Sequence, residues 1–321
     1  MKNYWQELKR PILMLSPMAG YTDSAFRIIC KQQGANLLMT ELTSADAIAH
    51  FVKKASSLKN NSTYKLMEFQ KEEMPIIIQL FGKHPEKFAI AAKWIEDNLA
   101  PAGIDINMGC PARKVIGSDH GATLLRDQER GVEVVKTVRN ATSLPLSVKT
   151  RLGWDHDDEI LEFGPKLINA GVDALIIHGR TYKDGFANIA RWENIYKIKS
   201  KLQNPNIKII GNGDIKSYDN VIQKLKNLDG VAIGRGAIGN PFIFNSKFEK
   251  LSESDKLKLK KETVIGHAKL AFEIKGEHGI IELRKHLLAY FKGQPGAKEL
   301  RKKFVKVSKI EDVKEIIRYI Q

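Results

Sequence analysis

Eight short apolar segments that alternate with helical patterns constrain the fold of this chain more than any other feature of its sequence. Apolar runs of this length, bounded by turn residues, predict strands. The segments between them carry apolar residues at helical spacing, as in residues 85–99 and 128–138. The eight predicted strands lie at residues 12–15, 36–40, 75–80, 103–107, 145–149, 173–178, 207–211 and 230–234.

This alternation predicts an α/β fold, and most specifically a (β/α)8 TIM barrel. The number of strand–helix units and the length of chain that they occupy both match that architecture. A doubly wound parallel sheet uses the same alternation and is the alternative. We therefore predict a barrel domain over residues 1–246.

The pattern changes after the barrel segment, where charged helices follow without further strands. A run of glycine, glutamine and proline at residues 293–296 interrupts these helices. We predict a small helical domain over residues 247–321, with helices at residues 252–273, 280–291 and 310–319.

The composition excludes the membrane and secreted classes of protein. No apolar stretch approaches the roughly 20 residues that span a bilayer, and residues 1–10 lack the apolar core of a signal peptide. Two cysteines, Cys30 and Cys110, are too few for a disulfide framework, which favours free thiols in a reducing compartment. We therefore predict a cytoplasmic protein in which Cys30, within a helical pattern, is a small buried hydrophobe.

The chain carries 52 basic and 37 acidic side chains, a formal net charge of +15, and such a charge attracts polyanions. The excess is concentrated in residues 247–321, which hold 19 basic and 11 acidic side chains. A lysine-rich run is commonly a solvated helix face, and that interpretation stays open here. Concentration of the charge in one separate segment favours contact with a nucleic acid.

Reactive side chains and glycines follow the predicted strands more often than turns alone require. In a barrel the carboxyl ends of all strands meet at one mouth, where the loops between strands and helices build the active site. We therefore expect these residues to gather in one place. They lie in residues 16–20, at Gln79, and in residues 107–111, 149–151, 178–180, 211–214 and 234–236.

The last two of these junctions predict a phosphate site. Barrels commonly bind phosphate in the loops after strands 7 and 8, where glycines let backbone N–H groups approach the oxygens. Arg235 adds a fixed positive charge. Gly234, Gly236 and Gly239 also match the dinucleotide-binding fingerprint, but no further strand follows to complete the βαβ unit that it requires. A mononucleotide phosphate held by both loops is therefore favoured.

Cys110 follows a strand end between Gly109 and Pro111, which predicts a rigid, exposed turn. Ordinary thiols are mostly protonated at neutral pH, so this side chain can donate a proton as readily as it can act as a nucleophile. A nucleophile would want a basic partner, and His178 is the histidine at a strand end. A metal site is disfavoured, because the two cysteines lie 80 residues apart and no metal-ligand spacing is present.

Lys149 and Arg151 stand two residues apart at the end of a predicted strand. If the strand loosens after Lys149, both side chains can point into the barrel mouth, one toward a cofactor and the other toward a substrate. An exposed pair at the sheet edge is the alternative. His120, in the loop after the cysteine turn, is either part of a lid or a polar turn residue.

Six of these segments strongly resemble the tRNA-dihydrouridine synthases, and the resemblance covers nearly the whole chain. Its most specific element is the Asn-x-Gly-Cys-Pro turn at residues 107–111. In the tail, residues 284–286 (RKH) and 295–298 (PGAK) resemble the bacterial B-type branch. The other segments are residues 17–23 (PMAGYTD), 148–151 (VKTR), 178–181 (HGRT), 211–214 (GNGD) and 234–236 (GRG).

The resemblance implies an FMN-carrying barrel that takes hydride from NADPH and reduces the C5=C6 bond of a uridine in tRNA. It also implies that Cys110 donates the proton and that Asn107, Arg151 and Arg180 hold the uracil. The chemistry is coherent, because hydride addition at C6 leaves negative charge at C5 that a protonated thiol can quench. The residues implied for the flavin are Pro17, Met18, Ala19, Gln79, Lys149, His178, Asn212, Gly213, Asp214, Gly234 and Arg235.

One segment departs from the family pattern. After residues 178–181, many members carry an arginine, a glutamine two positions further on, and later Ala-Asp-Trp. This chain has Tyr182 and Asp184 at the first two positions and residues 190–192 (ARW) at the third. The RNA contacts of that loop therefore stay open. The target base must also leave its stack to reach the barrel, at a cost of roughly a few kcal/mol.

Two other functions stay open at the level of the sequence. The first is a related barrel flavoenzyme that acts on a free pyrimidine or another small molecule, but the basic tail and the cysteine turn argue against it. The second is an RNA-binding barrel without catalysis, which the intact Cys110 and Lys149 argue against. We expect a monomer that binds tRNA, with no metal and no membrane contact.

Overall fold

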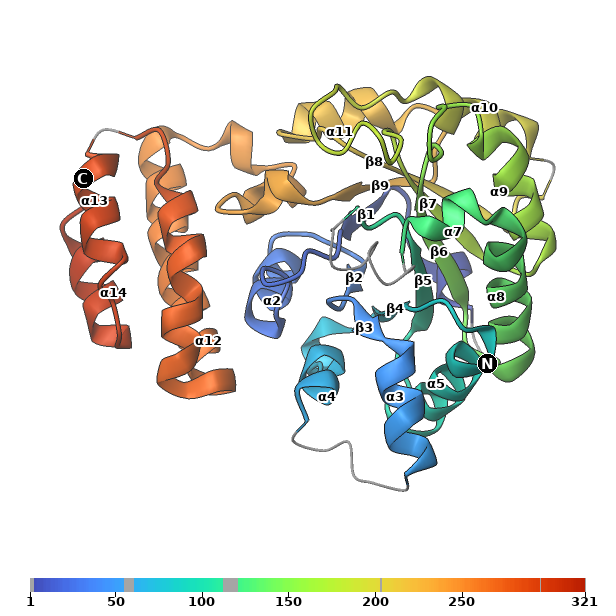
Figure 1. Cartoon of the computed structure of the whole chain (residues 1–321). Helices are drawn as coiled ribbons and strands as arrows, with labels where there is room; N and C mark the ends of the chain where they lie inside the picture. The colour runs from blue at the N-terminus through green and yellow to red at the C-terminus, as the bar shows by residue number, and fades with distance from the viewer. Residues whose placement is uncertain (1–2, 55–60, 112–120, 203, 295, 321) are drawn as a thin grey trace.

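The computed structural model describes residues 3–54, 61–111, 121–202, 204–294 and 296–320. Its main body is a parallel barrel with helices around it, and further helices stand to one side (Figure 1). Neighbouring strands follow the order β1-β9-β8-β7-β6-β5-β4-β2. Their bounds are β1 (Ile12–Leu15), β2 (Leu38–Met39), β4 (Ile76–Phe81), β5 (Gly103–Met108), β6 (Leu146–Arg151), β7 (Ala174–His178), β8 (Lys208–Asn212) and β9 (Gly230–Ile233).

The barrel closes between β1 and β2. Met14 forms a parallel bridge with Leu37, and the N–H of Leu15 donates to the carbonyl of Leu37 at 3.1 Å. On its other side β1 pairs in parallel with β9. The predicted (β/α)8 barrel is therefore confirmed. The doubly wound alternative is wrong, because such a sheet would stay open at its two edge strands.

The second predicted strand is shorter than expected and is followed by an additional one. Residues 36–40 yield only the two residues of β2, and β3 (Thr43–Ser44) pairs with the end of β4. Between β2 and β3, the hydroxyl of Thr40 accepts the N–H of Gln79 at 3.2 Å. The hydrophobic pattern could not show this interruption, because it depends on a side-chain bond to a neighbouring strand.

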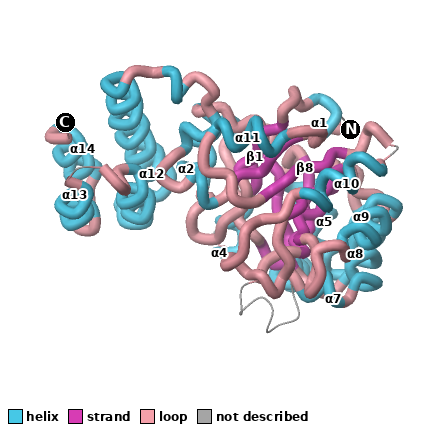
Figure 2. The backbone as a smooth tube through the Cα atoms, turned by 90° about the horizontal axis from the view of Figure 1, so that it is seen from above, coloured by secondary structure: helices cyan, strands magenta, loops and turns pink. Residues whose placement is uncertain are grey.

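Helices cover the outside of the barrel (Figure 2). Several begin at a capping side chain: Asp23 accepts the N–H of Phe26, and Ser44 accepts the N–H of Ala47. These helices are α1 (Tyr4–Glu7), α2 (Ser24–Gln32), α3 (Ala45–Lys53), α4 (Ser62–Met67), α5 (Pro85–Asn98), α7 (Thr123–Arg126), α8 (Gln128–Ala141), α9 (Ile160–Asn169), α10 (Glu193–Lys201) and α11 (Tyr218–Leu225), with 3-10 turns η1 (Lys71–Glu73), η2 (Arg235–Ala237), η3 (Pro241–Phe244) and η4 (Phe248–Lys250).

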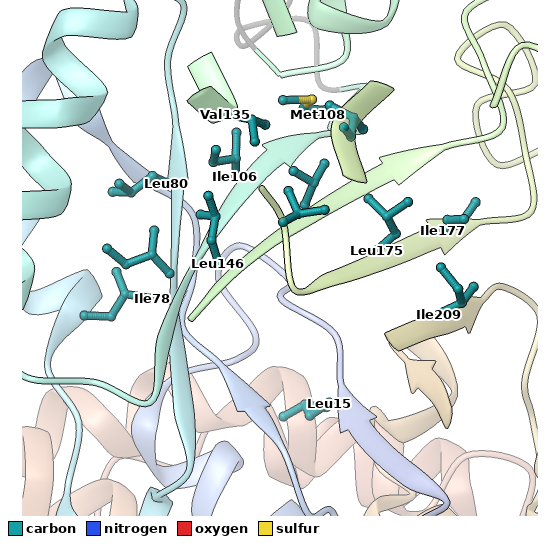
Figure 3. Packing of buried hydrophobic residues seen from close by; sticks show 14 of the residues in the cluster. Leu15, Ile78, Leu80, Ile106, Met108, Val135, Leu146, Leu175, Ile177 and Ile209 are labelled. Carbon is teal, nitrogen blue, oxygen red and sulfur yellow. The ribbon is translucent and has the colours of Figure 1, made fainter. Parts of the chain in front are cut away.

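Side chains alternate between the two faces of each strand, and this alternation builds the floor of the site. Outward-facing residues such as Leu175 pack in the layer between strands and helices (Figure 3). Inward-facing residues such as Ile176 and Ile210 form a separate apolar cluster inside the barrel. Two positions further along the same strands come His178 and Asn212, so polar side chains lie above an apolar floor.

The C-terminal region is helical, as predicted. Its longest element, α12, consists of two helical halves that meet at Gly276, where φ is 62°. The halves fold back on each other, since a Cβ added at Gly279 would lie 2.0 Å from the carbonyl oxygen of Ala271. The helices are α12 (Glu253–Tyr290), α13 (Ala297–Phe304) and α14 (Ile310–Arg318).

These helices share an apolar cluster of their own, which includes Leu283, Leu287 and Phe304. The ring of Phe242 belongs to this cluster and stacks on Phe248 at 4.3 Å, so packing continues across residue 246. The domain boundary at that residue stays a prediction. No helix in the described part of the chain is long and apolar enough to cross a membrane.

Candidate active site

The predicted site residues lie together at the carboxyl end of the barrel. Most of them end a strand or follow one directly, whereas Gln79 and Lys149 lie within β4 and β6. Strand β6 continues to Arg151, so the strand does not loosen after Lys149 as the sequence interpretation required. Because the two side chains are two residues apart on one strand, they still share the inner face.

Cys110 sits on a turn that one side chain holds in place. The Oδ1 of Asn107 accepts the N–H of Gly109 at 3.1 Å and the N–H of Cys110 at 3.0 Å. The carbonyl of Cys110 accepts the N–H of Ala122 at 3.3 Å. The thiol is a free cysteine and is half-buried. The predicted rigid turn thus has a physical basis in the Asn107 amide.

Lys149 is a half-buried cation at the mouth, and its Nζ donates to Asn212 Oδ1 at 3.1 Å. Burial and, secondarily, the positive charge of Arg151 lower the pKa of Lys149 to about 8. A lysine with such a pKa stays protonated at neutral pH at an energetic cost. An anionic ligand would relieve that cost.

Arg151 is buried, and it connects two loops. Its Nε donates to the carbonyl of Gly109 at 2.7 Å, and its Nη1 donates to the carbonyls of Thr181 and Gly185 at 2.8 and 3.0 Å. Burial lowers its pKa to about 10. The guanidinium therefore ties the cysteine turn to the loop that follows β7.

Arg180 and His178 form a second buried pair. Both oxygens of Asp214 accept Arg180 Nη2 at 2.8 Å, and Arg180 Nη1 lies 3.2 Å from His178 Nε2. A guanidinium can only donate, so His178 Nε2 accepts and the imidazole is neutral. Burial, reinforced by the charges of Lys149 and neighbouring arginines, holds the pKa of His178 well below its usual value.

The first of the two predicted phosphate loops, residues 211–214, adopts a conformation that requires its glycine. Gly213 has a φ of 127°, and an added Cβ would lie 2.7 Å from the Cβ of Ala190, so only glycine fits there. Burial acts to raise the pKa of Asp214, but hydrogen bonds from Ala190 and Arg180 bring it below its ordinary value. Arg235 lies 3.9 Å from that carboxylate, with 59% of its side chain exposed.

The loop after β1 forms the adjoining wall of the mouth. The N–H of Met18 donates to the hydroxyl of Thr22 at 3.0 Å, and its carbonyl accepts the N–H of Tyr21 at 2.9 Å. Pro17 and Met18 are half-buried, and Ala19 is exposed. Gly234 lies against this loop, because an added Cβ would be 3.6 Å from the sulfur of Met18.

Two predictions concern features beyond these residues. His120 lies outside the described residues, so its place in a lid or a turn stays a prediction. In the described part of the chain, no group of three or more histidine, cysteine, aspartate or glutamate side chains could hold a metal ion.

Comparison with known proteins places this mouth in a family. The model of the dihydrouridine synthases matches residues 14–321, which include every predicted site residue. The chain belongs to the dihydrouridine synthase family. It is therefore an enzyme of the oxidoreductase class.

Similar dihydrouridine synthases span nearly the same length. The chain is 36% identical to the probable tRNA-dihydrouridine synthase 1 of Synechocystis sp., over 95% of this chain and 85% of the relative. It is 35% identical to the probable tRNA-dihydrouridine synthase of Aquifex aeolicus, over 98% and 96%. The tRNA-dihydrouridine synthase B of Xanthomonas campestris is also 35% identical, over 91% and 87%. The B-type resemblance is therefore confirmed.

Solved structures support the barrel fold. A 2-naphthoyl-CoA reductase complex has a TM-score of 0.56 at 10% identity, over 74% of this chain and half of that chain. TcOYE with pHBA has a TM-score of 0.50 at 11% identity, over 73% of this chain and 87% of that chain. At such identities the likeness concerns the fold alone.

In this dihydrouridine synthase, the residues that depart from the family pattern stabilise their own loop. Asp184 accepts the N–H of Thr181 at 2.8 Å and pairs with Arg191 at 2.6 Å. The ring of Tyr182 stacks on Trp154 at 3.9 Å. The loop is therefore held in shape from within.

Sequence reasoning missed one residue of this loop, Phe186. Its ring is 55% exposed at the mouth, 4.7 Å from the guanidinium carbon of Arg235 and 5.5 Å from that of Arg151. It also lies 6.3 Å from the ring of His178. The sequence feature that could have pointed to Phe186 is an aromatic residue directly after Gly185 in the loop that follows a predicted strand. Only the fold shows that it lies between two arginines.

Proposed function

We propose that this enzyme reduces a uridine of tRNA to 5,6-dihydrouridine, with FMN as its flavin and NADPH as the hydride source. One observation supports this most strongly. Four cations, Lys149, Arg151, Arg180 and Arg235, converge on a mouth that also holds a cysteine turn. Burial and, secondarily, repulsion by neighbouring arginines lower the pKa of Lys149 and Arg151, which suits an anionic ligand.

The residues present fit a phosphate-bearing flavin. Arg235 and the glycine loops at Gly213 and Gly234 would hold the phosphate, with Asn212 and Asp214 beside the ribityl chain. The chemistry that bound FMN would supply is hydride transfer. The remaining flavin contacts in this proposal are Pro17, Met18 and Ala19 along one wall, Lys149 at the pyrimidine edge, and His178 near the ring. Gln79, which the resemblance also assigns to the pyrimidine edge, is fully buried and would act through Asn107.

Cys110 would donate the proton from its Sγ to C5 of the uracil. The thiolate that remains would be stabilised by the neighbouring cations Lys149 and Arg151, both of which interact electrostatically with this cysteine. Asn107, Arg151 and Arg180 would hold the base. Their existing hydrogen bonds fix the polar groups before the substrate arrives, which lowers the cost of orienting it.

The exposed face of Phe186 offers a platform for a base flipped out of a tRNA loop, because aromatic rings stack on any base. The basic C-terminal region would contact the phosphates of the same tRNA and offset part of the cost of flipping. An enzyme with these contacts would act on tRNA in the cytoplasm.

The test uses tRNA from cells that lack the gene. Purified protein is incubated with this tRNA and NADPH, and the nucleosides are analysed by mass spectrometry together with the flavin released from the protein. We expect FMN and newly formed dihydrouridine. Release of FAD, or NADPH consumption with a free pyrimidine and no modified tRNA, would favour the small-molecule alternative.

A further inference from the structure

A buried carboxylate lies at the end of a hydrogen-bond chain that leads to the cysteine turn. Asp105 is fully buried on the inner face of β5. Its Oδ1 accepts the hydroxyl of Ser147 at 2.7 Å, and its Oδ2 accepts Gln79 Nε2 at 2.8 Å. Gln79 and Asp105 are direct neighbours in the register between β4 and β5.

The hydrogen-bond chain continues toward the cysteine turn through two side-chain amides. Gln79 Oε1 accepts Asn107 Nδ2 at 2.9 Å. Asn107 Oδ1 then accepts the backbone N–H groups of Gly109 and Cys110. Gln79 is fully buried and Asn107 is 7% exposed, so water has little access to compete for these bonds.

Both ends of the chain fix its direction. A backbone N–H can only donate, so Asn107 must present its oxygen to Gly109 and Cys110. At the other end, Asp105 can only accept when it is ionised. Each amide between them can in principle be turned around, which exchanges its donor and its acceptor. Only the observed orientation lets Gln79 donate to Asp105 while Asn107 accepts from Gly109 and Cys110.

We propose that Asp105 and Gln79 are positioning residues, which orient the amide of Asn107 and thereby hold the turn that carries Cys110. The importance of this role for catalysis rests on the proposed function, in which Cys110 donates the proton. The positioning itself does not depend on the proposed function.

The cost of keeping Asp105 supports a dedicated role. Burial raises its pKa to about 7, although hydrogen bonds from Gln79 and Ser147 act in the opposite direction. An apolar residue at this depth would avoid the desolvation cost. No step proposed for the reaction uses this carboxyl directly. It interacts electrostatically with Lys149, and through its hydrogen bonds it orients the amide chain.

A set of variants can test the direction of the hydrogen-bond chain by reversing it and then restoring it. Ser147→Ala alone is the control, because Asp105 still accepts from Gln79. Adding Asp105→Asn replaces the carboxylate with an amide whose N–H groups have no partner at position 147 once Ser147→Ala has removed the hydroxyl. Donation from this amide to Gln79 Oε1, with Gln79 and then Asn107 turned around, now competes with the observed orientation. Adding Gln79→Glu to that pair provides a carboxylate that accepts from both neighbours, and Asn107 regains its orientation.

The readouts are hydrogen exchange at the backbone amides of Gly109 and Cys110 and the rate of Cys110 alkylation by iodoacetamide, in the full-length protein as purified. We expect the double variant to exchange these amides about tenfold faster, because they lose a hydrogen-bond partner. The control should match the wild type, and the triple variant should recover slow exchange. Alkylation should change in the double variant and recover in the triple one.

Gln79→Met provides a second route if the double variant does not fold, since it removes the amide without a buried charge. Thermal melting identifies variants that fold. Unchanged exchange at Gly109 and Cys110 in folded Gln79→Met, or faster exchange in the double variant that the triple variant does not recover, would overturn the proposal. Neither readout needs tRNA or added flavin, so a failure of the proposed function would leave these results as they are.

Discussion

The barrel mouth and the contact between the helical region and the barrel both bury charged and polar side chains, but they do so in opposite ways. At the mouth, positive charge exceeds negative charge, and Lys149 and Arg151 have lowered pKa values. At the contact, charges are matched: Lys275 lies 2.8 Å from Asp23 and 2.6 Å from Glu282. The mouth is arranged to receive an anion, whereas these charges at the contact already have partners.

Two histidines of α12, His286 and His267, also lie at the contact between the helical region and the barrel. His286 Nε2 donates to the carbonyl of Tyr21 at 3.1 Å, and His267 Nδ1 lies 3.2 Å from the Tyr290 hydroxyl. The ring of Phe26 from α2 lies 4.4 Å from that of His286. The contacts of His286 fasten the helical region to α2 and to the loop after β1, which also lines the mouth, whereas the His267–Tyr290 contact lies within α12. Matched polar groups here hold two parts of the protein together.

The largest effect is expected at the mouth, from Cys110→Ala. Loss of a proton donor lowers the rate of dihydrouridine formation by about 10²–10⁴-fold. Reduction of the flavin by NADPH should stay normal, because the proton is needed only afterwards. Stopped-flow absorbance and product analysis measure the two steps. Cys30→Ala is the matched control, since Cys30 is fully buried in α2. Normal turnover in Cys110→Ala would assign the proton to another group.

The second prediction concerns acid and the contact. Burial lowers the pKa of His286 to about 3, so the unfolded chain takes up its proton first as the pH falls below 6.5. The free energy of unfolding should therefore decrease by about 1.4 kcal/mol per pH unit on account of this residue. His286→Gln keeps a donor for Tyr21 and cannot titrate.

The measurement is the difference in unfolding free energy between wild type and His286→Gln from pH 7 to pH 5, by urea denaturation. Asp105 changes the unfolding free energy in the opposite direction between pH 7 and pH 5. Its pKa is raised to about 7, so the folded protein takes up this proton first as the pH falls. Its contribution is common to both proteins and cancels. Equal slopes in the two proteins would mean that His286 takes up its proton over the same pH range in the folded and the unfolded protein.

A smaller effect is expected from Phe186→Ala. Loss of one stacking surface for a base costs about 1–3 kcal/mol, which should appear as a lower kcat/KM for tRNA. Phe186→Tyr should retain most of the activity, because it keeps the ring. Ile222→Ala on α11 is a control at an exposed apolar side chain of the outer helices. If kcat/KM does not change in Phe186→Ala, this ring does not carry the base.

The smallest effect is expected from the exposed charges of α13. Arg301, Lys302 and Lys303 are exposed in its last turn, but Lys302 already pairs with Glu299 at 2.8 Å. Changing all three to alanine should therefore flatten the salt dependence of tRNA binding by about two units rather than three. Lys93→Ala, which removes a paired lysine on α5, is the control. An unchanged slope would make this surface a solvated helix face.

The sequence by itself determined the alternation of strands and helices and the set of residues at the strand ends. These features are local: a strand alternates its side chains between two faces, and a turn follows each strand, so residues such as Cys110 and His178 could be placed at one mouth before any contact was known. Gly213 is another local feature, because the positive φ that it adopts is a property of its own backbone.

Only the tertiary structure decided which side chains meet. The chain from Asp105 through Gln79 to Asn107 depends on the register of β4 against β5, which the pattern of either strand leaves open. The place of Phe186 between two arginines likewise depends on three separate parts of the chain: the end of β6, the loop after β7 and the turn after β9. Contacts of this kind join residues far apart in the chain, and their geometry is set by packing of the whole barrel rather than by any local preference.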